Sequence, residues 1–170
     1  AFIFSLITHA AIIFVYNELF SFFDAISTTS ARIFWTLEAA GSLILVYSLQ
    51  RSGRIRLGDL SSLREALTLK GFSRMQKAVI TGTTLLYIVP LLFLAVYVAP
   101  NNYDTHMYHL NRILSWIYNG NLDHFPTMHL QQLYLNVFAE YMVLDTVLLA
   151  GSDQFAGLVQ FGAFLGSIGG

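Results

Sequence analysis

A run of 22 residues from Ala78 to Ala99 contains no charged side chain, and this leaves few environments in which it can fold. At about 1.5 Å of rise per residue, a helix of this length crosses the roughly 30 Å hydrocarbon core of a bilayer. Pro90 inside the run predicts a kink. We therefore interpret the run as a membrane-spanning helix.

The composition extends this interpretation, because 55% of the 170 residues are hydrophobic and only 11% are charged. Soluble domains carry about 25% charged residues. We predict an all-α integral membrane protein with about five transmembrane helices, and we expect residues 1–170 to be the N-terminal part of one polytopic domain of a longer protein. The absence of cysteine excludes a disulfide framework, a cysteine zinc site and a thiol nucleophile. The predicted spans are residues 1–23, 31–49, 78–99, 129–150 and 155–170.

Seven of the nine basic residues lie in the loop from 50 to 77. Short loops rich in Lys and Arg stay on the cytoplasmic side of a membrane. We therefore expect loop 50–77 to be cytoplasmic and loop 100–128 to be extracytoplasmic. Residues 59–69 predict a short amphipathic helix on the anionic leaflet. The topological role accounts for the basic charges, so we predict no nucleic-acid partner.

Loop 100–128 concentrates the polar chemistry of the chain, with two aspartates, an arginine and three of the five histidines. At 100° per residue, Asp104 and Arg112 fall toward one side of a helix and most aliphatic residues toward the other. This pattern predicts an interfacial amphipathic helix from Asp104 to Asn119, ended by Asn119–Gly120. Its apolar side would face the membrane.

Each polar residue of this helix also has a purely structural interpretation. Asp104 fits the N-cap of the helix. The position of Arg112 is compatible with an anchor to a lipid phosphate or with a salt bridge back to Asp104. His106 and His109 fit interfacial packing. A divalent metal stays open as an alternative, although no metal-binding motif appears and we predict no cofactor. The possible N and O ligands are Asp104, Asp123, His106, His109, His124 and His129.

Polar residues within the predicted spans suggest packing partners or a wet cavity. Gln132, Asn136 and Glu140 repeat at i, i+4 and i+8, which predicts one polar stripe on one helix. Glu38 is expected to be protonated, paired or facing a cavity, because an ionised carboxylate is costly in a bilayer. Asp145 is expected to reach the cytoplasmic interface.

The segment from Tyr103 to Glu140 follows a longer pattern. It reads YDTHMYHLNRILSWIYNGNLDHFPT, then QQLYLNVFAE, and SDQFAGLVQFGAFLGSI comes after it. It resembles bacterial polytopic glycosyltransferases of the GT-C class, and is similar to the dolichyl-phosphate-mannose–protein mannosyltransferases and the lipid A aminoarabinose transferases. Many of these carry W/Y-D-x-x-x-Y-H-x-x-R, NGxxxHYPT and RQLYxPPxAE. Here Gln131 stands for the Arg of the last motif, and Asn136–Val137 for its Pro-Pro.

The resemblance implies a glycosyltransferase of the bacterial inner membrane. It would move a sugar from a polyprenyl-phosphate donor to an extracytoplasmic lipid, glycan or protein acceptor, with membrane lipids and the lipid-linked donor as partners. Asp104 is then the catalytic carboxylate that takes or orients the acceptor proton. The expected substrate-binding residues are Tyr108, His109, Arg112, His124, Asn136 and Glu140.

Two other functional classes remain open. A transporter or flippase of polysaccharide or lipid-linked sugar would use His9, Glu38 and Glu140 as pathway groups. A non-catalytic membrane scaffold would need the carboxylate of Asp104 for stability and not for activity.

Overall fold

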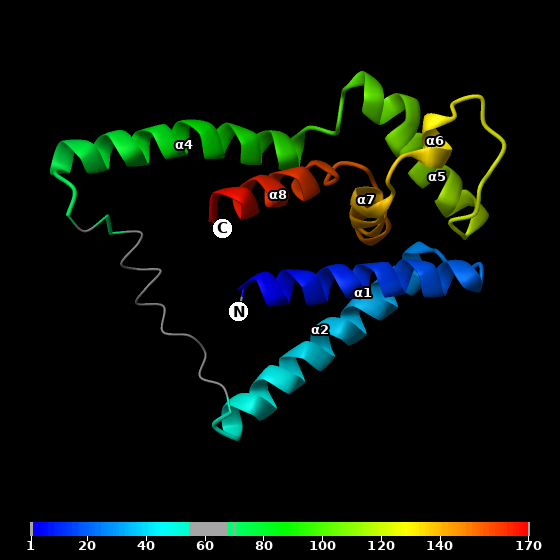
Figure 1. Cartoon of the computed structure of the whole chain (residues 1–170), viewed down its shortest axis with the longest axis horizontal. Helices are drawn as coiled ribbons and strands as arrows, with labels where there is room; N and C mark the ends of the chain where they lie inside the picture. The colour runs from blue at the N-terminus through cyan, green and yellow to red at the C-terminus, as the bar shows by residue number, and fades with distance from the viewer. Residues whose placement is uncertain (1, 55–67, 70, 170) are drawn as a thin grey trace. The chain divides into compact units, whose positions relative to one another are not determined.

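The computed structural model describes residues 2–54, 68, 69 and 71–169, and within these ranges every regular element is a helix. The amphipathic helix predicted over 59–69 falls almost wholly outside the described residues. Figure 1 shows the elements in chain order. They are α1 (Phe2–Phe22), α2 (Thr28–Arg51), α4 (Arg74–Tyr97), η1 (Thr105–His109), α5 (Leu110–Asn119), α6 (Gln131–Tyr134), α7 (Phe138–Ala150) and α8 (Gly157–Gly169).

Three helices are long and apolar enough to cross a membrane, which identifies the chain as a membrane protein by length and composition. Their apolar stretches are Ser5–Phe22, Thr28–Arg51 and Arg74–Tyr97. The all-helical class and these three long helices were predicted from the sequence. Five spans remain a prediction, because α7 and α8 have 13 residues each.

The chain divides into two compact units, one of Ala1–Phe34 with Leu92–Gly170 and the other of Trp35–Leu91. In the second unit none of the described side chains is buried, as expected for helices that face lipid. Glu38 belongs to this unit and accepts a hydrogen bond of 2.8 Å from the hydroxyl of Ser42. This bond partly satisfies the carboxylate within its own helix.

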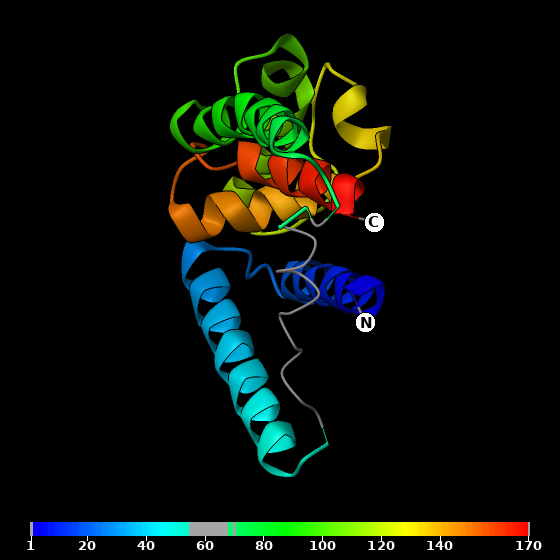
Figure 2. The same ribbon diagram turned by 90° about the vertical axis from the view of Figure 1, so that its left-hand side faces the viewer.

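The core of the first unit forms around α7, which packs against α1, α5 and α8. Figures 1 and 2 show that α7 lies next to α1 and crosses it, because each helix is seen nearly end-on in the view where the other lies lengthwise. Apolar side chains from three helices fill the contacts. Among these helices α5 is strongly amphipathic, whereas α1 and α7 have no single apolar face. The buried side chains are Ile13 and Tyr16 of α1, Ile113 and Trp116 of α5, and Tyr141, Leu144 and Leu148 of α7.

A buried polar contact joins α1 to α7 within this core. The side-chain amide of Asn17 donates to the carboxylate of Asp145 at 3.1 Å and to the carbonyl of Ile13 at 3.0 Å. Asp145 is only 5% exposed. The prediction that Asp145 reaches the cytoplasmic interface is therefore wrong, because packing of α7 on α1 encloses it.

The single helix predicted over 129–150 is interrupted. α6 ends at Tyr134, Leu135 is extended with φ −69° and ψ 149°, and α7 begins at Phe138. The side-chain oxygen of Asn136 accepts a hydrogen bond of 3.0 Å from the amide of Phe138 at the start of α7. The predicted stripe on one helix is thus wrong. Two of its members, Gln132 and Glu140, are nevertheless buried at 6% and 3% exposure.

The end of α5 is tied to the turn between α1 and α2. Gly120 caps α5 with φ 78°, as predicted for Asn119–Gly120, and its carbonyl accepts from the amide of Ile26 at 2.8 Å. A Cβ atom at Gly120 would lie 2.8 Å from the carbonyl oxygen of Asp24. Only glycine fits both the conformation and this close approach.

Candidate active site

A widened helical turn, η1, precedes α5 and sets the orientation of the site. The amide of Leu110 donates to the carbonyl of Thr105, five residues back, which is the π-helical pattern. The sequence prediction places residues on a helical wheel with a uniform 100° per residue, which cannot represent such a turn. Insertions of this kind are frequent at functional sites.

Side chains satisfy the carbonyl groups of the widened turn. The amide of Asn111 donates to the carbonyl of His106 at 2.6 Å. The amide of Gln132, from α6, donates to the carbonyl of Met107 at 2.8 Å. Gln132 in turn accepts a bond of 2.9 Å from the hydroxyl of Thr127. Gln132 therefore links three segments, a role that the sequence analysis missed although the residue lies in the quoted motif.

Arg112 lies inside the protein with 1% exposure and joins α5 to the chain around α7. Its Nη1 forms a buried ion pair with the carboxylate of Glu140 and donates to the carbonyl of Leu135 at 3.1 Å. Its Nη2 donates to the carbonyl of Gln131 at 2.6 Å. The guanidinium also lies 5.6 Å from the ring centre of Trp116.

This geometry corrects two expectations for Arg112. It does not lie on an exposed polar face, because the buried face of α5 is turned toward α7, where Glu140 supplies an opposite charge. It does not pair with Asp104. A guanidinium enclosed in this way favours a positioning role over direct contact with a lipid phosphate.

His109 completes the cluster. Its Nδ1 lies 2.5 Å from Oε1 of Glu140, while 41% of the His109 side chain is exposed. The ring of Tyr108 lies 4.2 Å from the His109 ring, centre to centre. Glu140 thus holds Arg112 with one oxygen and orients His109 with the other. The exposed part of the imidazole can meet a ligand.

Asp104 is exposed in the first turn, with helical φ −63° and ψ −41°. The N-cap interpretation of Asp104 is wrong, because the side chain of Asn102 accepts the capping bond of 2.8 Å from the amide of Thr105. Desolvation raises the pKa of the Tyr108 hydroxyl, and the negative charge of Asp104 and a side-chain hydrogen bond with it raise that pKa further. Tyr108 therefore remains a neutral donor beside the Asp104 carboxylate.

The remaining two predicted site residues, His124 and Asn136, form no side-chain hydrogen bond with Arg112, His109 or Glu140 among the described residues. His124 and Asn136 are exposed, and Asn136 serves at the start of α7. Among the described residues, no three His, Asp or Glu side chains gather as a metal site. The predicted absence of a metal stays a prediction.

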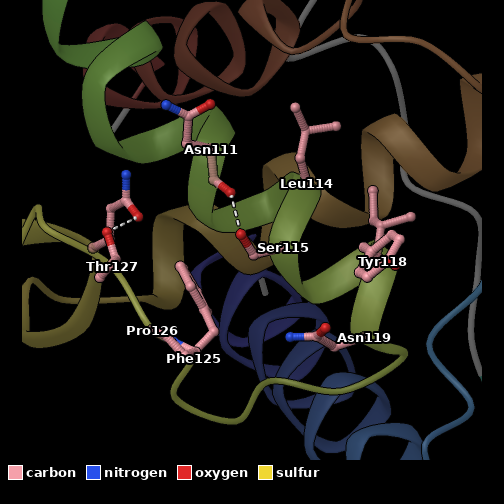
Figure 3. Close-up of a pocket in the computed structure, with 10 residues that line it drawn as sticks. Asn111, Leu114, Ser115, Tyr118, Asn119, Phe125, Pro126 and Thr127 are labelled. Atoms are coloured by element: carbon pink, nitrogen blue, oxygen red, sulfur yellow. Dashed lines mark hydrogen bonds between the residues drawn. The ribbon is translucent and has the colours of Figure 1, made fainter.

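An open groove of about 760 Å³ lies between α5 and the segment that follows it. Figure 3 shows Asn111, Leu114, Ser115 and Tyr118 along α5, with Phe125, Pro126 and Thr127 across from them. Ile117, Asn119 and Gln132 complete the lining. The groove mixes amides and hydroxyls with aliphatic and aromatic side chains.

Comparisons with protein-family models, with curated proteins and with solved structures found no match to this chain. The resemblance to GT-C glycosyltransferases therefore rests on the pattern of residues quoted above, and the activity it implies is a proposal.

Proposed function

We propose that this protein is a membrane glycosyltransferase of the GT-C type. It transfers a sugar from a polyprenyl-phosphate donor to a lipid, glycan or protein acceptor at the extracytoplasmic face of a bacterial inner membrane. Asp104 is its catalytic carboxylate, and Glu140 and Arg112 position the helix that carries it.

One observation carries the proposal: the three separate parts of the quoted pattern meet in space. The first part, which contains His109 and Arg112, bonds to Glu140 of the last part. The middle part bonds to the last part through Thr127 and Gln132. These contacts hold a helix whose first turn presents an exposed carboxylate, and that arrangement suits a preorganised catalytic group.

The chemistry assigned to Asp104 balances. The acceptor oxygen or nitrogen forms a bond to the anomeric carbon of the donor sugar. The bond from that carbon to the phosphate oxygen breaks, and the lipid phosphate leaves with the electron pair. Asp104 takes the acceptor proton. The neutral hydroxyl of Tyr108 donates to the Asp104 carboxylate and can orient it toward the acceptor. The exposed edge of the His109 imidazole, whose Nδ1 faces Glu140, can contact the donor or the acceptor.

The test is transfer from radiolabelled polyprenyl-phosphate sugars by the protein in membranes, with wild type compared to Asp104→Asn. Asp123→Asn is the matched control, because Asp123 is a second exposed acid of the same loop. We expect Asp104→Asn to lose transfer by at least about 10²-fold at unchanged expression and melting temperature. Unchanged transfer by Asp104→Asn, or loss caused by Asp123→Asn instead, would contradict the assignment.

A transporter or flippase is the second candidate, favoured by the buried Asn17–Asp145 contact between α1 and α7. Ionisable groups within membrane-spanning bundles often mark proton or substrate pathways. If wild type transfers sugar from none of the donors, and Asp145→Asn abolishes movement of a fluorescent lipid-linked sugar across liposomes, this candidate replaces the first.

A further inference from the structure

The groove between α5 and the following segment contains no charged lining side chain among the residues that the structure describes. A lipid phosphate needs cations or several directed N–H donors. The groove offers side-chain amides, hydroxyls and apolar surface instead. The absence of a charged lining side chain therefore favours an uncharged occupant.

Several polar groups of the groove have capacity left for a ligand. The amide of Asn111 donates to the carbonyls of His106 and Met107, so its side-chain oxygen still accepts. Asn119 forms no side-chain hydrogen bond in the described part of the chain, and Tyr118 is 92% exposed at the groove edge. Neutral donors and acceptors of this kind match the hydroxyl groups of a sugar.

The apolar lining of the groove matches the C–H face of a sugar ring. A pyranose has a face of C–H groups as well as a rim of hydroxyls, and aromatic side chains pack against such faces. Tyr118, Phe125 and Leu114 all line the groove (Figure 3). Binding sites commonly combine apolar and aromatic walls with a few polar groups that fix orientation.

We propose that this groove binds an uncharged glycosyl unit, and we assign it to the sugar of the acceptor. The assignment to the acceptor rests on the proposed function. The neutral lining separates this site from the phosphate of the donor. Sugar binding in the groove itself does not depend on catalysis, because Asp104 does not line it.

The test is saturation-transfer NMR on the protein in sugar-free nanodiscs. The probes are the methyl glycosides of glucose, mannose, galactose, N-acetylglucosamine and arabinose, with methyl glucuronide as the charged counterpart of the glucoside. We expect at least one neutral glycoside to receive saturation, and the glucuronide to receive several-fold less than the glucoside. Tyr118→Ala should reduce the signal at least threefold. Tyr103→Ala, which removes another exposed tyrosine outside the groove, should leave it unchanged.

Three results would overturn the proposal: no signal from any neutral glycoside, equal signals from glucoside and glucuronide, or equal signals in wild type and Tyr118→Ala. Asp104→Asn separates this proposal from the proposed function. We expect the sugar signal to survive in that variant. Sugar binding without transfer from any donor would refute the glycosyltransferase and the assignment to its acceptor, and would leave the groove as a site for an uncharged glycosyl unit.

Discussion

The buried pair of Arg112 and Glu140 permits a direct measurement of what holds α5 against α7. Arg112→Met removes the guanidinium and leaves the carboxylate with His109 as its partner. Glu140→Met removes the carboxylate and leaves a guanidinium with only 1% exposure without its counter-charge. The double variant removes both charges and retains side chains of comparable length.

The structure sets the expected magnitudes. Glu140→Met strands a buried guanidinium and should reduce the free energy of unfolding by about 3–5 kcal/mol. Arg112→Met leaves the buried carboxylate with His109 as its partner, so the loss of the ion pair alone should cost the same or less. Arg112→Met also removes the donor to the carbonyls of Gln131 and Leu135. Each of these carbonyls that is not hydrogen-bonded by water instead should lower the free energy of unfolding by about 1–3 kcal/mol. The double variant buries no charge from the pair. We expect its cost to be smaller than the sum of the two singles by at least about 2 kcal/mol.

The assay is unfolding in mixed micelles with a rising fraction of sodium dodecyl sulfate, followed by tryptophan fluorescence, since Trp116 lies beside the pair with 3% exposure. Arg32→Met is the matched control. Arg32 is exposed and donates to the carbonyl of Leu149 at 3.2 Å, so its loss should cost about 1 kcal/mol or less. If the cost of the double variant equals the sum of the two single costs within about 0.5 kcal/mol, the coupling of Arg112 to Glu140 is refuted.

Three further predictions concern packing in the same unit. Gly120→Ala should destabilise by about 1–3 kcal/mol, because it combines φ 78° with a Cβ contact of 2.8 Å to a backbone oxygen; an unchanged melting temperature would contradict this. Asn17→Leu should destabilise by leaving the carboxylate of Asp145 alone, and adding Asp145→Leu should recover stability in the same unfolding titration. Gly157→Ala should destabilise, because its Cβ would lie 3.2 Å from a backbone atom of α4, whereas Gly162→Ala meets nothing within 4 Å and should be neutral or stabilising by melting temperature.

The long helices were predictable because their formation depends on local composition. An apolar run such as 78–99 needs no distant partner to become helical in a bilayer. The end of α5 at Gly120 was also predictable, since an Asn-Gly pair favours the left-handed turn that the structure contains. Local signals were sufficient in both cases.

The orientation of the site was not predictable from the same signals. The burial of Arg112 depends on Glu140, 28 residues away in sequence. The widened turn depends on Gln132, which supplies a donor to a carbonyl of that turn. The break after α6 has no proline or glycine to mark it, and Arg112 helps to stabilise it by bonding to the carbonyl of Leu135. The quoted pattern contained both Arg112 and Glu140, but helical periodicity alone could not pair them.

The tie between Gly120 and the turn after α1 also has a consequence for assembly during synthesis. Asp24 precedes Gly120 by 96 residues (120 − 24), so at about 5–20 residues per second the ribosome makes the α1–α2 turn roughly 5–20 s before its partner. The backbone amide of Ile26 has therefore already been synthesised when the carbonyl of Gly120 leaves the ribosome, and it can donate its hydrogen bond at once. A pause in translation between these two points should be tolerated, whereas exchanging the order of the two segments should leave the carbonyl of Gly120 without its partner until the turn has been made.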